Sequence, residues 1–232
     1  MRLMIRRLTT IAAVIAAMGL ASSPAALAAH YGSSARSAQD RVNDAVNIVQ
    51  QMQQKPSLAA VLEQARGVFI IPHYGRGGFI VGGQGGGGVV LVKHGMAWSS
   101  PAFYSIGGGS IGAQAGGEGG AIAMILMTRK AVDHFENSSG SWSLNGGAGL
   151  TVVNWSGRAR ANTNRGDVIL WTNTKGLYGG LTASVTRISP DTKLDRAYYQ
   201  RPVTSREILA GNVTSVNSDP LRDALASRVA SR

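Results

Sequence analysis

Residues 65–92 read ARGVFIIPHYGRGGFIVGGQGGGGVVLV, a run in which short apolar stretches alternate with glycine clusters. Between Gly67 and Gly120 the chain carries 19 of its 31 glycines. Glycine at this density disfavours helix, by up to about 1 kcal/mol per residue relative to alanine. Strongly curved sheets, in contrast, use glycine at bends, bulges and close backbone approaches. This part of the chain therefore predicts a strongly curved sheet.

Short strands are expected between and after the glycine clusters. The apolar pieces inside the glycine-rich part lie at residues 68–71, 79–81, 89–93 and 102–106. Residues 121–127 form a continuous apolar run, which fits either a strand buried on both faces or a short buried helix. Later strands are expected at 167–171 and at 181–186, where apolar and polar residues alternate.

Helices are expected on both sides of this strand-rich part. Residues 34–54 carry a mostly alanine stripe at helical spacing, which suits close packing on a sheet: Ala35, Ala38, Val42, Ala45, Val49 and Met52. Shorter helices are expected at 58–65 and 128–135. Thr204 and Glu207 form a capping box, and Gly211 provides a stop, so a helix is expected at 205–210, before a loose terminal helix within 212–232.

The order of these elements predicts the fold class. We expect an α+β fold, with a strongly curved, barrel-like antiparallel β-sheet, N-terminal helices and a short C-terminal helix. The folded domain is expected to span 29–211, and residues 212–232 are expected to form a C-terminal tail.

The first 28 residues have the pattern of a secretory signal peptide. Arg2, Arg6 and Arg7 precede an apolar run, which ends before the small-residue sequence Ala26-Leu27-Ala28. The apolar run is short for a membrane span of about 20 residues. We therefore expect cleavage after Ala28 and an exported protein of the periplasm or outer envelope. Removal of these three arginines lowers the formal charge from +11 to +8.

The chain has no cysteine, which excludes disulfides, thiolate metal ligands, cysteine nucleophiles and an acylated lipobox cysteine. A lipid anchor is therefore not expected. The histidines His73, His94 and His134 lack the spacing of a zinc motif, so we predict neither a metal site nor another cofactor.

Two glycine strings resemble catalytic or nucleotide-binding motifs. Residues 82–88 lack the following helix and the Lys-Ser/Thr pair of a phosphate loop, so a glycine-rich bend is expected there. Residues 108–112 match G-x-S-x-G around Ser110, but the glycines that follow make the helix of a nucleophile elbow implausible. We expect no enzymatic activity. Glu118 lies among glycines, where it is either exposed at a strand end or paired with a basic group or a ligand headgroup.

Basic side chains provide the clearest binding signal. Arg158 and Arg160 alternate with alanines, so both arginines lie on one face of a predicted strand, and Arg165 follows. Arg129, Lys130 and Lys175 add positive charge. Guanidinium groups bind phosphate oxygens in a bidentate manner, so these six residues are candidate contacts for lipid headgroups.

Four segments carry a resemblance to a known family. They are the run at 65–92, WSSPAFYSIGGGSIGAQAGGEGG at 98–120, KGLYGGLTASV at 175–185 and AYYQRPVTSREIL at 197–209. In this order they resemble the SYLF-domain family. The resemblance implies a lipid-binding module, with eukaryotic members associated with phosphoinositide membranes and in some cases with actin, and bacterial members exported to the envelope. The helix at 34–54 differs from the basic N-terminal segment of eukaryotic members, because its charges are balanced.

The resulting hypothesis is a non-enzymatic module that recognises anionic phospholipid headgroups at an envelope membrane surface. Trp98, Phe103 and Tyr104 are expected to be exposed apolar loop residues that insert shallowly into the membrane. The alternative is a structural protein of the periplasm or outer envelope that binds a protein or a cell-wall polymer. Nucleic acid is not expected, since no nucleic-acid-binding motif occurs. Actin is also not expected as a partner, because the chain is predicted to be exported.

Overall fold

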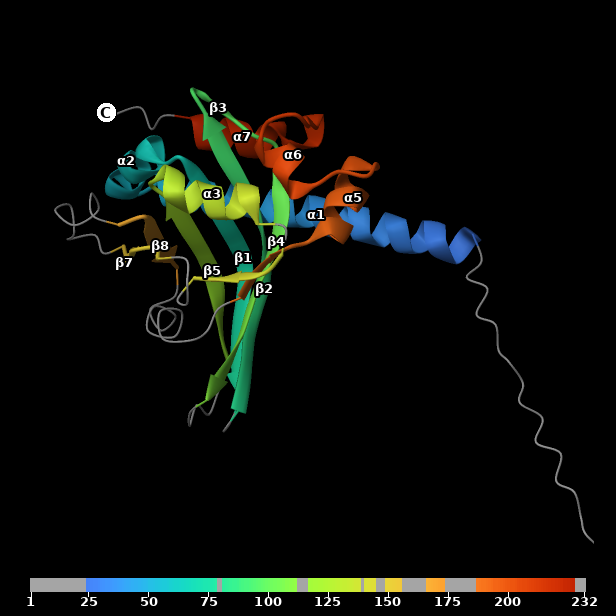
Figure 1. Ribbon diagram of the computed structural model, residues 1–232, viewed down its shortest axis with the longest axis horizontal. Helices are drawn as coiled ribbons and strands as arrows, with labels where there is room; N and C mark the ends of the chain where they lie inside the picture. Colours follow the sequence, from blue (N-terminus) through green and yellow to red (C-terminus); the bar gives the residue numbers. More distant parts are fainter. Residues whose placement is uncertain are drawn as a thin grey trace, which may run out of the picture.

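The computed structural model describes residues 24–78, 81–111, 117–138, 140–144, 149–155, 166–173 and 187–227. Figure 1 shows a strongly curled sheet with a long helix on one side and helices packed on both of its faces. The chain order begins with two helices, continues through the strands and ends in short helices. The predicted α+β class and the curved sheet are confirmed.

The described sheet contains nine strands, in the order β6-β9-β4-β2-β1-β5-β8-β7, with β3 paired to β2. All pairings are antiparallel except β7 with β8, which is parallel. The strands are β1 (Gly67–Gly78), β2 (Val81–His94), β3 (Ala97–Trp98), β4 (Ala102–Ile111), β5 (Gly117–Leu126), β6 (Trp142–Ser143), β7 (Val152–Asn154), β8 (Val168–Thr172) and β9 (Arg187–Pro190).

The helices cover both faces of the sheet. They are α1 (Pro24–Gln53), α2 (Pro56–Gln64), α3 (Arg129–Asn137), α5 (Thr192–Tyr199), α6 (Ser205–Leu209), the 3-10 helix η2 (Val216–Ser218) and α7 (Asp219–Ala226). The predicted alanine stripe of α1 packs on the sheet, with Ala38, Ala45 and Val49 fully buried. Small side chains let the helix approach the strands closely, which explains the composition of the stripe.

A second core lies on the opposite face of the same strands, beneath α3 and α6. Phe69, Tyr104 and Phe135 form edge-to-face pairs there, with ring centroids 5.4–6.2 Å apart. The apolar run 121–127 supplies β5, and its residues 121–126 are buried on both faces. Of the two alternatives for this run, the buried strand is therefore correct.

The predicted helix signals are found at the ends of α3 and α6. The Thr128 side chain accepts a hydrogen bond from the Ala131 N–H at the start of α3. Thr204 and Glu207 form the predicted capping box of α6, and Gly211 has a φ of +82°. This left-handed conformation suits glycine and ends the helix.

The end of the chain is more ordered than expected. Residues 212–227 contain η2 and α7, and Leu221 and Leu225 of α7 are buried in the core against α1. A terminal helix is present, but the prediction that it is loose is wrong for these residues, because α7 packs against α1, a contact between distant parts of the chain that sequence periodicity does not reveal. The domain boundaries at residues 28 and 211 stay predictions. The strand predicted at 181–186 lies outside the described residues.

The glycine string at 82–88 is part of the long strand β2, so the predicted bend is wrong. Its residues are paired with β1 on one side and β4 on the other. Strand β1 has a bulge opposite, where its register with β2 shifts between Ile70 and His73. A Cβ atom on Gly86 would lie 2.5 Å from the His73 carbonyl oxygen. Glycine is needed here because the bulge brings the two backbones together.

Within the described ranges, no helix combines the length and the apolar character required to cross a bilayer.

Candidate interaction surface

Four adjacent strands continue beyond the two cores as a glycine-rich extension, which we call the glycine ribbon. It consists of residues 75–78 of β1, 81–88 of β2, 107–111 of β4 and 117–120 of β5. Figure 1 shows these strands running past the helices that cover the rest of the sheet. The ribbon is the part of the described sheet with the fewest side chains.

On one face of the ribbon, two consecutive rows across the four strands consist entirely of glycine. The register aligns Gly109, Gly83, Gly77 and Gly117 in one row, and Gly107, Gly85, Gly75 and Gly119 in the next. Cβ atoms built on Gly75 and Gly83 would meet nothing within 4 Å, and neither residue has a positive φ. The fold itself therefore does not require glycine at these two positions. Glycine in a strand lowers the stability of the folded state relative to residues with side chains. The two glycine rows therefore reduce stability.

Gln84 is the one residue with a side chain between Gly82 and Gly88. It is 7% exposed, and both of its side-chain polar atoms are buried without a hydrogen-bond partner. Some buried polar side chains are satisfied within the chain: the Ser99 hydroxyl donates to the Ser100 carbonyl, and the Ser205 hydroxyl donates to Asp195. Leaving a buried amide unpaired costs about 1–3 kcal/mol. Gln84 shares this feature with other side chains that have a buried polar atom without a hydrogen-bond partner, among them Arg41, Trp142 and Trp171.

Arg41 of α1 lies at the border between the ribbon and the core. Its guanidinium occupies the space that a side chain at Gly87 would fill. Burial lowers the pKa of Arg41, and the negative charge of Asp191 partly offsets this. One turn along α1, Asp44 pairs with His73 of β1, with 3.0 Å between Oδ2 and Nε2. These contacts hold α1 against the end of the ribbon that adjoins the core.

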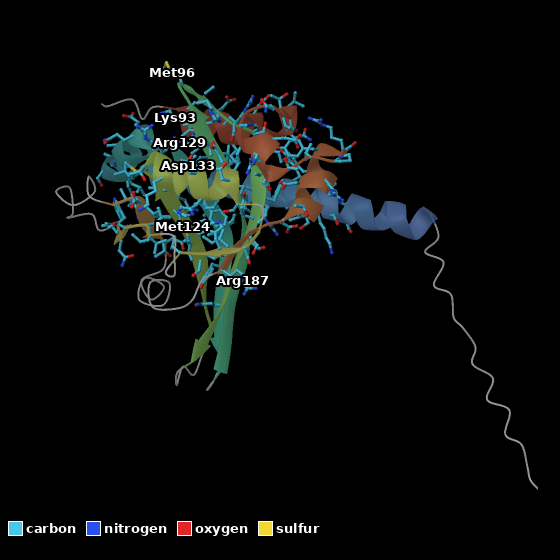
Figure 2. All side chains as sticks on the ribbon, in the orientation of Figure 1. Lys93, Met96, Met124, Arg129, Asp133 and Arg187 are labelled. Carbon is cyan, nitrogen blue, oxygen red and sulfur yellow. The ribbon has the colours of Figure 1, made fainter. Side chains whose placement is uncertain are left out.

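The predicted cationic site is only partly within the described residues. Figure 2 shows Arg129 and Asp133 together on α3, and Arg129 Nε donates to Asp133 Oδ1 over 2.8 Å. Arg129 also pairs with Glu136, and Lys130 donates to the Gly149 carbonyl. Both cations are therefore engaged within the chain. Arg158, Arg160, Arg165 and Lys175 lie outside the described residues.

The predicted membrane-contacting residues are not exposed, so this expectation is wrong. Trp98 is 6% exposed, and Phe103 and Tyr104 are 0% exposed. Phe103 and Tyr104 are consecutive residues of β4, so they face opposite sides of the sheet, and each side is covered by helices. Phe103 packs on Tyr198, whereas the Tyr104 hydroxyl donates to the Phe135 carbonyl over 2.8 Å.

A buried carboxylate joins the C-terminal helices to β4. Asp195 of α5 is 0% exposed, and it accepts hydrogen bonds from the Phe103 N–H and the Ser205 hydroxyl. Burial raises the pKa of Asp195 to about 7, although both hydrogen bonds favour the ionised form. Burial also raises the pKa of the neighbouring Tyr104. This buried carboxylate was not predicted from the sequence, because no helix was expected at residues 192–199.

The remaining sequence candidates occupy separate places. Ser110 lies within β4, rather than on a strand-to-helix turn, and Glu118 of β5 is in register with Arg76 of β1. His94 contacts the Leu209 carbonyl, and His134 stacks on Trp142. In the described ranges, acidic residues and histidines form no group able to hold a metal ion. These residues therefore do not converge on one chemical site.

Comparison with known proteins identifies the family. The family model described as "Ysc84: Las17-binding protein actin regulator" matches residues 107–228. The chain belongs to the Ysc84 family. This family contains the SYLF domain, so the resemblance in the sequence is confirmed.

Three curated relatives come from yeasts. Protein YSC84 of Saccharomyces cerevisiae is 30% identical over 72% of this chain and 37% of its own length. LAS seventeen-binding protein 3 of the same species is 30% identical over 72% of this chain and 38% of its own length. An SH3 domain-containing protein of Schizosaccharomyces pombe is 27% identical over 73% of this chain and 41% of its own length. No solved structure matches the chain.

These comparisons correct the expected partners. The family description and the relative's name refer to Las17 binding and actin regulation, so the exclusion of actin from the sequence was wrong. The exclusion rested on predicted export rather than on a surface of the protein. The chain spans about two fifths of the length of the relatives that it matches.

Proposed function

We propose that this Ysc84-family chain is a non-catalytic protein-binding domain, and that the glycine ribbon is its docking element. The observation that carries the proposal is the pair of glycine rows, which present bare backbone on a part of the sheet beyond the helices. Bare backbone allows the side chains of another protein to approach closely. The names of the yeast relatives support actin filaments as the first partner to test.

A membrane surface fits the described residues less well. Binding to anionic lipid requires free cations or an apolar insertion segment. Arg129 and Lys130 are engaged within the chain, and Phe103 and Tyr104 are buried. The glycine rows provide neither charge nor apolar side chains. Recognition of phospholipid headgroups is therefore the competing outcome of the test.

Two binding assays with the purified chain separate these functions. We expect the chain to sediment with actin filaments, and to show little recovery with floated vesicles containing anionic phospholipid. The variant Arg129→Gln with Lys130→Gln is a matched control for charge, since both residues lie on α3, away from the ribbon. Salt-sensitive recovery with anionic vesicles, without sedimentation on filaments, would overturn the proposal in favour of lipid binding.

We further propose that the chain is exported and processed after Ala28, as its first residues predict. Intact mass after expression with its own leader tests this, with loss of the first 28 residues as the expected result. An uncleaved chain that remains inside the cell would contradict export. In an exported protein, the partner would be an envelope protein that uses the same ribbon.

A further inference from the structure

We propose that the face of the ribbon that carries the two glycine rows binds an acidic, extended segment of the protein partner, and that Arg187 of β9 pairs with its carboxylates. This inference rests on the proposed function and adds the chemistry of the segment that the ribbon recognises. Its starting point is the position of Arg187, which the register places at the end of one glycine row.

Arg187 extends a row of glycines across the sheet. It pairs with Gly107 of β4, and Gly107 pairs with Gly85 of β2. The same row continues through Gly75 of β1 and Gly119 of β5. Residues directly opposite each other in adjacent strands point to the same face, so the Arg187 side chain shares the face of the glycine rows. Figure 2 shows Arg187 beside the long strands. The row is therefore bare on the four strands of the ribbon and carries a long cationic side chain on β9.

This face is open to a partner at the positions beside Arg187, which is itself exposed. A Cβ atom built on Gly107 would meet only the Gln84 carbonyl oxygen within 4 Å, at 3.7 Å. Cβ atoms on Gly75 and Gly83 would meet nothing within that distance. No side chain therefore fills the space above these three glycines. A segment can lie on the bare backbone there and reach the guanidinium of Arg187.

The positive charge of Arg187 is not balanced by an acidic residue of the chain. All 12 acidic residues lie within the described ranges. Among the described residues, no ion pair or hydrogen bond engages the Arg187 side chain. An exposed guanidinium beside bare backbone therefore remains available to a carboxylate of another molecule.

Arg41 of α1 places a second cation where the bare face meets the core. Its guanidinium lies over Gly87, which faces the same side of β2 as the glycine rows. Within the described part of the chain, Arg41 forms no ion pair or hydrogen bond. Asp191, whose charge acts on Arg41, accepts a hydrogen bond from the Leu194 N–H at the start of α5. Arg41 therefore adds to the positive potential that an acidic segment would meet.

A polypeptide that carries carboxylates is the ligand that fits this face. Carboxylates bind guanidinium groups through two parallel hydrogen bonds. In an extended segment alternate side chains point to one side, so acidic residues at alternate positions can all face the sheet. The large apolar side chains that are exposed among the described residues are Met96 and Val216, and neither belongs to the ribbon. The described residues of this face therefore offer no apolar side chain for membrane insertion, which favours an acidic protein segment over a phospholipid headgroup.

Binding of a model acidic peptide tests the chemistry without actin. The probe is a short fluorescent peptide of alternating glutamate and threonine, and its counterpart carries glutamine in place of glutamate. We expect saturable binding of the glutamate peptide at low salt, measured by fluorescence anisotropy, and about tenfold weaker binding of the glutamine peptide. Equal affinities for the two peptides, or no binding of the glutamate peptide, would overturn the inference.

Variants of two exposed arginines locate the site. Arg187→Gln should weaken binding of the glutamate peptide about fivefold, because the ion pair is lost. Arg187→Lys should have a smaller effect, since lysine keeps the charge but not the two parallel donors. Arg66→Gln is the matched control, because Arg66 is exposed, has no ion pair among the described residues, and precedes β1 at the end away from the ribbon. Equal losses in Arg187→Gln and Arg66→Gln would indicate attraction to overall charge, and the inference would then be wrong.

Sedimentation with actin filaments separates the inference from the proposed function. We expect Arg187→Gln to weaken filament binding about fivefold, and Arg66→Gln to leave it unchanged. Filament binding that Arg187→Gln does not alter would overturn the inference and retain the function. Binding of the glutamate peptide without sedimentation on filaments would support the inference and count against actin as the partner. Arg187-dependent flotation with vesicles containing phosphatidylserine, without binding of the glutamate peptide, would replace the acidic segment by a lipid headgroup and overturn the inference.

Discussion

Asp195 of α5 accepts a hydrogen bond from the main-chain N–H of Phe103 on β4, with 2.9 Å between Oδ1 and N. The carboxylate is fully buried and also accepts from Ser205 at the start of α6. It therefore ties two C-terminal helices to a central strand. A group in this position couples the stability of the fold to pH.

Stability should decrease as pH rises through the pKa of Asp195. Its pKa is raised from 3.8 to about 7 by burial. The folded state binds this proton more tightly than the unfolded state does. The resulting contribution to the free energy of unfolding is fully present below about pH 4 and is lost by about pH 7. We expect the free energy of unfolding of the wild type, measured with urea, to fall by on the order of 3 kcal/mol from pH 5 to pH 8, relative to that of Asp195→Asn. Asp133→Asn, on an exposed part of α3, is the control; parallel curves for wild type and Asp195→Asn would contradict the expectation.

Alanine should have opposite effects at two glycines of β2. Gly83→Ala places a methyl group in open space, so we expect an unchanged or slightly higher free energy of unfolding, by up to about 1 kcal/mol. Gly86→Ala places Cβ 2.5 Å from the His73 carbonyl oxygen, so the strand pairing must shift and stability should fall by more than about 1 kcal/mol. Thermal unfolding of the two variants checks this, and similar melting temperatures would refute it.

The C-terminal helix should contribute to global stability. Leu221 is 0% exposed in the core beneath α1, so Leu221→Ala should lower the free energy of unfolding by about 2–4 kcal/mol. Val216 is 80% exposed, and Val216→Ala is the control for a nearby apolar residue. Denaturant unfolding measures both. If Leu221→Ala behaved like Val216→Ala, residues after 211 would form the loose tail expected from the sequence.

The cations of α3 should have little influence on membrane binding. Arg129 is held by Asp133 and Glu136, and Lys130 by the Gly149 carbonyl. We therefore expect Arg129→Gln with Lys130→Gln to change recovery with anionic vesicles less than twofold, since engaged cations add little attraction at the surface. Flotation at low and high salt gives the measurement. A several-fold loss at low salt would restore these residues to the predicted headgroup site.

Much of the fold could be predicted because its signals are local. The alanine stripe on α1 and the capping box of Thr204 and Glu207 are written in residues close together in the chain. A helical repeat and a capping box each depend on residues within a few positions of one another, and the structure contains both. The apolar run 121–127 remained ambiguous, because periodicity does not separate a buried strand from a buried helix.

The candidate surface was harder to predict because it depends on register. The sequence marks Gln84 as the single side chain among the glycines 82–88, but it does not reveal that its amide is buried and unpaired. It also presents Phe103 and Tyr104 as candidates for exposure, whereas β4 places them against helices on opposite faces. Burial of a strand residue depends on distant elements that cover each face.

The sequence alone determined the curved α+β architecture, the short helices α2, α3 and α6, and the concentration of glycine in residues 67–120, because propensity and periodicity act over short distances. Tertiary structure decided what this glycine does. Pairing of four strands gathers glycines from β1, β2, β4 and β5 into two rows, while the bulge in β1 requires glycine at Gly86. The glycines of the two rows are far apart in the chain, so only the hydrogen-bonded register brings them together on one face.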